Sequence, residues 1–72
     1  MSREYVIIIE RGERNCSAYA PDLPGCIATG KTIEETKRNM TEAIEAHLQF
    51  MRETGDVIPE PTAVVADSVT VG

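Results

Sequence analysis

The sequence predicts an α+β fold with the element order β-β-β-α-β. Three observations support this. Short β-branched stretches separated by turn residues fill the first 30 positions, an amphipathic pattern of helical period covers residues 33–54, and another β-branched stretch follows two prolines. Because 72 residues suffice for one compact unit, we expect a single domain over residues 1–72.

Three strands are expected before the helix. Residues 5–9 are one Tyr followed by four β-branched residues, which favours a central strand, and the polar residues 11–15 have the chemistry of a turn. Residues 16–20 form the second strand and residues 26–29 the third, antiparallel to it. Between them, two prolines and a glycine predict a stiff loop over residues 21–25 with Leu23 at its tip, because proline has no backbone donor.

A helix is expected over residues 33–54. Thr32 and Glu35 have the spacing of a capping box, and Gly55 stands where a left-handed residue would end the helix, with prolines at 59 and 61 beyond it. Apolar residues recur at intervals of 7, 4, 4 and 3, so they share one stripe that should pack on the sheet. They are Ile33, Met40, Ile44, Leu48 and Met51.

Residues 62–71 are rich in valine and threonine and predict a fourth strand. A right-handed crossover through the helix would return this strand parallel to the first one, which gives the sheet order 3-2-1-4. An open sheet face and an unpaired outer edge would remain in a single copy, and so short a chain has a marginal core. We therefore expect self-association into a dimer or tetramer.

The charge balance limits the kinds of partner. Seven Lys and Arg stand against twelve Asp and Glu, a net charge of -5. Binding to nucleic acid depends on cations that neutralise phosphates, so direct DNA binding is not expected and a basic protein partner is favoured. Apolar runs fall well short of the roughly 20 residues of a membrane helix, and the N-terminus has no cleavage-site pattern. We expect no membrane association and a cytoplasmic protein.

Cys16 and Cys26 are expected to be free thiols. In a hairpin centred near Leu23, Cys16 faces Gly30 and Cys26 faces Ala20, which places the thiols roughly 13 Å apart along the strands, beyond the roughly 7 Å that a disulfide can span. The single histidine, His47, lies at the margin of the apolar stripe and is expected to be a half-buried packing residue. We expect no metal site and no cofactor.

Catalysis is not expected either. Most of the nine glutamates occupy polar helix positions, where they solvate the surface. A metal-dependent nuclease would need three or four converging carboxylates, and Glu10 and Asp67 are the only candidates on strands.

Several separated motifs, in a fixed order, resemble the HicB-like antitoxin family, including its stand-alone UPF0150-type members. They are residues 17–26 (SAYAPDLPGC), 30–32 (GKT), 34–35 (EE), 42–48 (EAIEAHL) and 58–61 (IPEP). The resemblance implies a partial ribonuclease-H-like fold, in agreement with the element order above. It also implies an antitoxin of a type II toxin–antitoxin system that binds HicA, a small basic toxin that cleaves messenger RNA. Typical members carry a DNA-binding domain after the fourth strand, whereas this sequence stops at Gly72.

The candidate partner-binding residues lie in the proline loop, at the start of the helix and on its exposed side. They are Pro21, Asp22, Leu23, Pro24, Gly25, Lys31, Thr32, Glu35, Glu42 and Glu45. Two other functions are carried as alternatives: a stand-alone homo-oligomeric interaction domain without a toxin partner, and a metal-dependent nuclease of ribonuclease-H type.

Overall fold

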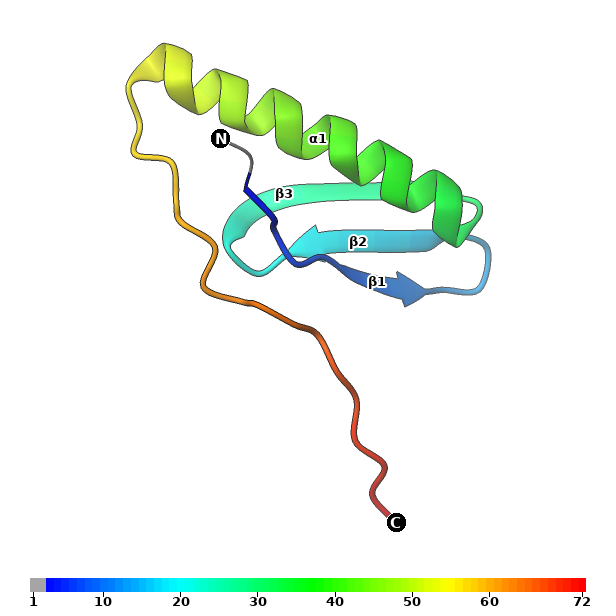
Figure 1. The fold of residues 1–72 in the computed structure, drawn as a ribbon. Helices are drawn as coiled ribbons and strands as arrows, with labels where there is room; N and C mark the ends of the chain where they lie inside the picture. Colours follow the sequence, from blue (N-terminus) through cyan, green and yellow to red (C-terminus); the bar gives the residue numbers. More distant parts are fainter. Residues whose placement is uncertain (1–2) are drawn as a thin grey trace.

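The computed structural model describes residues 3–72, which form an antiparallel sheet covered on one face by a long helix (Figure 1). The strands are β1 (Ile8–Arg11), β2 (Cys16–Ala20) and β3 (Leu23–Gly30), in the spatial order β1-β2-β3, and the helix is α1 (Ile33–Thr54). Three antiparallel strands followed by one helix confirm the predicted α+β class for this part of the chain.

The central strand β2 alternates between its two faces. Cys16, Ala18 and Ala20 are buried beneath α1, whereas Ser17 and Tyr19 point to the open face of the sheet. This alternation is the period of two expected for a strand with one covered face. Cys16 pairs with Gly30 as predicted, and both cysteines are free and buried.

The first strand begins later than the sequence predicts. Its ladder starts at Ile8, which pairs with Tyr19, rather than at residue 5. Only Ala20 then remains in β2 before Pro21, which has no backbone N–H to extend the ladder. Residues 5–7 are therefore extended and half-buried but lie outside the strand.

The third strand is longer than predicted, and the proline loop is correspondingly shorter. β3 begins at Leu23, so only Pro21 and Asp22 form the turn, and the expectation of a stiff five-residue loop is wrong. A register shift at Ala20 and a left-handed Gly25 (φ 84°) accommodate the irregular start of the strand. Pro24 is tolerated because β3 is an edge strand.

Leu23 is a core residue, which corrects its prediction as an exposed loop tip. Its side chain is only 1% exposed and its backbone pairs with Ala20. The register shift turns this side chain beneath the helix, where it packs with Met40. Leu23 therefore cannot contact a partner in this fold.

The helix has the predicted bounds and caps. Thr32 Oγ1 accepts a hydrogen bond from the Glu35 N–H at 3.0 Å, which satisfies one free donor of the first turn. Gly55 adopts the left-handed conformation (φ 78°), and the Asp56 N–H donates to the Met51 carbonyl at 2.9 Å to close the last turn.

Gly30 allows the helix to approach the sheet closely. A Cβ atom at this position would lie 2.7 Å from both the backbone nitrogen and Oγ1 of Thr36. Thr36 is fully buried, and its hydroxyl donates to the Thr32 carbonyl at 2.7 Å. The glycine is thus required by a backbone contact with the first turn of α1, in addition to its place in the strand-to-helix turn.

The core is small. Its buried apolar residues lie between the sheet and α1, and partly buried side chains from residues 5–9 and from the helix pack around them. Of the predicted helical stripe, Met40 is fully buried, Ile44, Leu48 and Met51 are half-buried, and Ile33 is exposed; His47 is half-buried as predicted. The buried apolar residues are Cys16, Ala18, Ala20, Leu23, Cys26 and Met40.

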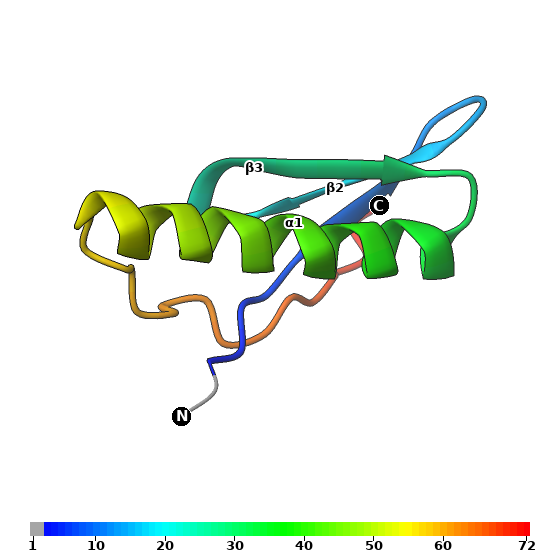
Figure 2. The ribbon, with the colours of Figure 1, turned by 90° about the horizontal axis from the view of Figure 1, so that it is seen from above.

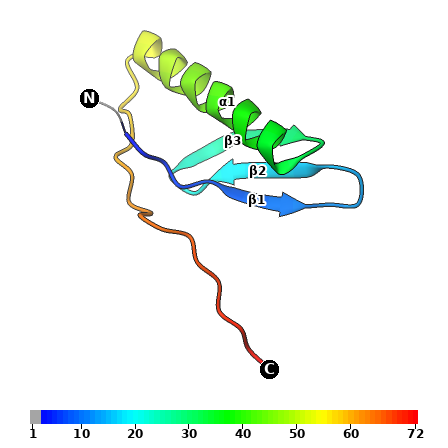
Figure 3. The same ribbon diagram turned by 45° about the vertical axis from the view of Figure 1, so that its right-hand side comes forward.

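The predicted fourth strand does not form in this chain. After Gly55 the backbone runs away from the helix to residue 72 without strand or helix, and the sheet keeps the order β1-β2-β3 instead of 3-2-1-4 (Figures 1 and 3). The N–H groups of Thr62 and Ala63, at the start of the predicted strand, donate to Asp22 instead of to a neighbouring strand. We call residues 64–71 the C-terminal arm.

Candidate functional site

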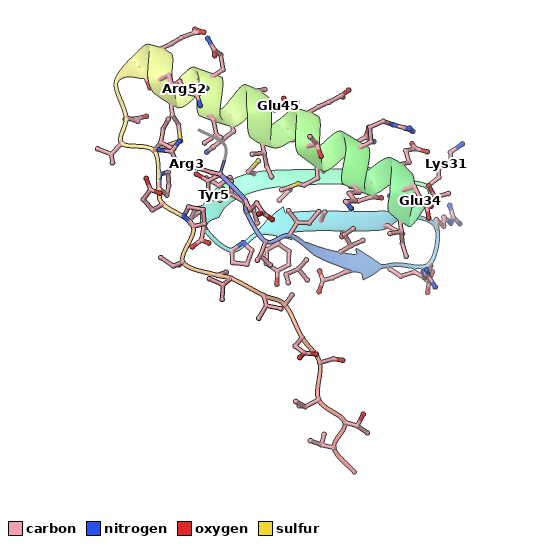
Figure 4. All side chains as sticks on the ribbon, viewed as in Figure 1. Arg3, Tyr5, Lys31, Glu34, Glu45 and Arg52 are labelled. Atoms are coloured by element: carbon pink, nitrogen blue, oxygen red, sulfur yellow. The ribbon has the colours of Figure 1, made fainter. Side chains whose placement is uncertain are left out.

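The structure divides the sequence-predicted site residues between the two ends of β3. Pro21 and Asp22 precede this strand, whereas Lys31 and Thr32 follow it. Seven residue steps of about 3.3 Å separate the ends by about 23 Å, too far for one compact contact. Figure 4 shows Lys31 and Glu34 at one end of the molecule, opposite Arg52 at the other end of the helix.

The helix connects these two ends. α1 packs on β3 and β2 and runs back along β3, as the view from above shows (Figure 2). Asn39 Nδ2 donates to the Thr29 carbonyl at 2.8 Å, which fixes one flank of the helix beside the outer edge of β3.

Three glutamates share one direction on α1. Glu35, Glu42 and Glu53 are 7 and 11 residues apart, and at about 100° per residue these spacings bring them to within about 20° of one direction. Asn39, which reaches β3, falls between the first two. We call these three residues the acidic flank. Glu42 is two residues from the buried Met40, about 160° round the helix, so the acidic flank faces solvent on the outer side of α1.

Glu45 belongs to a different surface, although the sequence suggested the same role for it as for Glu42. Its side chain borders a groove of about 370 Å³ between α1 and the segment that leads into β1. Apolar side chains that include Ile7, Ile44 and Leu48 form the floor of this groove.

The rim of the groove is cationic. Arg3, Lys37 and Arg52 line it together with Glu45, and Figure 4 shows Arg3 lying near Arg52. Arg3 also pairs with Glu60 at 3.2 Å. The chain is acidic overall, yet three of the four charged side chains that line this groove are cations.

The carboxylate of Asp22 accepts hydrogen bonds from elsewhere in its own chain. Its Oδ2 accepts hydrogen bonds from the N–H groups of Thr62 and Ala63, both at 3.0 Å, and its Oδ1 accepts one from the Thr62 hydroxyl. The Thr62 hydroxyl bond, followed by the Ala63 amide bond, lowers the pKa of Asp22 below its usual value. Sequence reasoning missed this role because nothing local in the sequence links Asp22 to a residue 40 positions away.

Neither a metal site nor a membrane-spanning helix is found in the described part of the chain. Across residues 3–72, no three His, Cys, Asp or Glu side chains come together as metal ligands. Over the same residues, no helix combines the length and apolar character needed to cross a membrane.

Comparison with known proteins identifies the family. The model of the HicB-like antitoxins of bacterial toxin–antitoxin systems matches residues 5–70. The chain belongs to the HicB-like antitoxin family. The motifs singled out in the sequence therefore gave the correct family.

Several curated relatives share this segment. A UPF0150 protein of Thermoplasma acidophilum is 34% identical over 61 residues, which cover 83% of this chain and 88% of that protein. An uncharacterised 14.9 kDa protein of Haemophilus phage HP1 is 33% identical over 60 residues, and a UPF0150 protein of Helicobacter pylori is 46% identical over 41 residues. The matches span 45% of the phage protein and 57% of the Helicobacter pylori protein, about half the length of each.

A solved structure shares the HicB-like fold. A chain in the HicA3 and HicB3 toxin–antitoxin complex matches this structure with a TM-score of 0.73 and 28% sequence identity. The match covers 83% of this chain and 70% of the other.

Proposed function

We propose that this HicB-like chain is a non-catalytic antitoxin that binds and neutralises a small basic HicA-type toxin. The observation that carries the proposal is the likeness, at 28% identity, to a chain from the HicA3 and HicB3 toxin–antitoxin complex. Membership of the HicB-like antitoxin family supports it independently.

The acidic flank is the surface best suited to such a partner. Glu42 and Glu53 are exposed and Glu35 is half-buried, so all three carboxylates can face a basic protein without large desolvation. A surface with an excess of carboxylates also accelerates the encounter with an oppositely charged protein and orients it, and here the exposed Arg38, four residues before Glu42, offsets part of that charge.

The outer edge of β3 gives this surface a second means of recognition. Within residues 3–72, β3 pairs on one side with β2 and has no strand on the other. An unpaired edge presents backbone N–H and C=O groups to a partner, and the helix that packs on β3 carries the acidic flank on its outer side. We place the toxin contact along this edge.

The sequence-predicted residues contribute unequally to this surface. Lys31, Thr32 and Glu35 lie at one end of the β3 edge, and the exposed Pro21, Pro24 and Gly25 lie at the other. In this proposal Glu42 is central. Leu23 and Asp22 play no part in the contact, because one is buried and the other binds the root of the C-terminal arm.

Co-expression tests this function. We expect the small basic protein encoded beside this chain to arrest growth and cleave messenger RNA when expressed alone, and to co-purify with this chain and lose that activity when the two are expressed together. A neighbour that keeps its full activity beside an excess of this chain, or the absence of any such neighbouring gene, would contradict the proposal.

One observation favours the stand-alone homo-oligomer as a second candidate. Ile8, Tyr19 and Ile27 stand in one row across the open face of the sheet, because Tyr19 pairs with both isoleucines. Tyr19 is 42% exposed and Ile27 68%, an apolar patch that association would cover. The nuclease alternative has no comparable support in the described residues, where no metal-ligand cluster occurs.

A further inference from the structure

The C-terminal arm leaves this chain with more surface than a compact protein of its size. The accessible surface is 5730 Å², whereas a folded 7.9 kDa monomer exposes about 4,400 Å² by the usual size relation. The excess of about 1,300 Å² exceeds the roughly 800 Å² that each partner buries in a standard interface. The radius of gyration, 13.4 Å, is likewise larger than the about 11 Å expected for 72 residues.

The arm has the sequence of a strand, but its valine side chains stay exposed. Its four valines are 73–86% exposed. In an extended chain every second residue shares a face, so Val65, Asp67, Val69 and Val71 would form one side of the strand. That side is apolar apart from one carboxylate.

Residues 59–63, which we call the root of the arm, are held by contacts with the folded part of the chain. Within residues 3–72, no hydrogen bond of this kind is seen for the arm itself. Arg3 binds Glu60, the Tyr5 hydroxyl binds the Pro59 carbonyl, and Asp22 holds residues 62 and 63. Val64 and residues 66–68 of the arm border two hollows, of about 450 and 400 Å³, that residues 4–9 of the same chain also line. The arm runs beside this segment but forms no ladder with it, so the β1 edge keeps its backbone groups unpaired among the described residues.

The open edge of β1 has the length and chemistry to receive such an arm. Residues 5–11 are extended and, among the described residues, have no strand on their outer side. This stretch matches the eight residues of the arm to within one residue. The apolar floor and cationic rim of the groove lie directly beside it.

We propose that the C-terminal arm of one copy lies along the open β1 edge of a second copy and covers that copy's groove, each copy giving and receiving one arm. The three valines of one face then meet Ile7, Ile44 and Leu48, and Asp67 meets Lys37 on the cationic rim. Such an exchange has closed twofold symmetry. It pairs the backbone N–H and C=O groups of each arm with those of the β1 edge in the other copy.

Oligomeric state and arm variants test the exchange without any toxin, so the outcome is independent of the proposed function. Light scattering after size exclusion should give twice the 7.9 kDa chain mass at 100 μM. Val69→Pro removes a backbone donor within the arm and should shift the protein to a monomer, whereas Val57→Pro, outside the arm at an equally exposed valine, should leave the dimer. A monomeric parent protein, or a dimer that Val69→Pro leaves intact, would overturn the proposal.

A disulfide experiment distinguishes exchange between copies from closure within one chain. Chains that carry Asp67→Cys are mixed with chains that carry Lys37→Cys and oxidised, while the native thiols, 3% and 4% exposed, give little background. A covalent heterodimer is expected from the mixture and from neither variant alone. If the mixture yields no heterodimer and the two substitutions in one chain form only an internal bridge, the arm closes on its own chain and the proposal is wrong.

Discussion

Asp22 and Thr62 are joined by two hydrogen bonds, although 40 residues separate them in the chain. The bonds connect the β2–β3 turn to the segment that follows the helix and its prolines. A third bond, from the Ala63 N–H, completes the set at 3.0 Å. The position of the C-terminal arm thus depends on one carboxylate.

Asp22→Asn should release the root of the arm while leaving the sheet and helix folded. The amide group replaces one acceptor oxygen with a donor nitrogen, so the contacts with Thr62 and Ala63 cannot all be kept. Hydrogen exchange at the Thr62 and Ala63 amides should quicken at least several-fold, with exchange in α1 unchanged. Asp56→Asn is the matched control, because the Asp56 carboxylate accepts a bond from the Thr54 hydroxyl and none is seen from residues 62 and 63. Equal exchange in the parent and the Asp22→Asn variant would contradict the role assigned to Asp22.

The same contact should depend on pH in the acid range. The pKa of Asp22 is lowered in the folded state by its hydrogen bonds to Thr62 and Ala63, so the stabilising contribution is complete above the unfolded value of about 3.9. It is lost as the pH falls through the lowered folded value and the carboxylate is protonated. Amide chemical shifts of Thr62 and Ala63, followed by NMR, should titrate with a shared midpoint below the ordinary aspartate value. A midpoint at or above the ordinary aspartate value would be inconsistent with the observed contacts.

Gly30→Ala should destabilise the fold by about 1–3 kcal/mol, because the added methyl group overlaps the backbone of Thr36 and the first helical turn must shift. Urea unfolding followed by circular dichroism measures this effect. Gly72→Ala, where nothing lies within 4 Å of the new Cβ, should leave the midpoint unchanged. If Gly30→Ala and Gly72→Ala unfold at the same urea concentration, the close approach of α1 to the sheet does not restrict the side chain at position 30.

The two thiols should be unreactive in the folded protein. Cys16 and Cys26 are 3% and 4% exposed, and burial raises the pKa of the Cys26 thiol, which reduces its thiolate fraction. Ellman's reagent should therefore react slowly at pH 8 until denaturant is added and should then titrate two thiols per chain. Rapid reaction of either thiol in native buffer would indicate that the core opens locally.

The sequence predicted those elements whose signals are local. The helix bounds follow from Thr32 and Gly55, whose capping chemistry acts within a few residues, and the Cys16–Gly30 register follows from the hairpin. The shift of β1 and the burial of Leu23 depend on how β2 ends at Pro21, which only the ladder register shows.

The candidate site was predictable only in part. Glu35 and Glu42 were recognised, and their helical spacing could have identified Glu53 as the third member of the same flank. Glu45 was grouped with them by proximity in sequence, whereas its placement in the cationic groove depends on which side of α1 faces β1. The engagement of Asp22 by Thr62 has no local sequence signal at all.

The central claim is that the acidic flank of α1 binds a basic toxin. Isothermal titration of the co-encoded small basic protein into this chain tests it most directly, with the Glu42→Lys/Glu53→Lys variant compared against Glu10→Lys/Glu13→Lys, which changes net charge equally at the β1 end. We predict tight binding to the parent chain, at least a tenfold weaker affinity for the acidic-flank variant, and a change of less than threefold for the control. Equal weakening by both variants, or unchanged affinity after reversal of the acidic flank, would contradict this account.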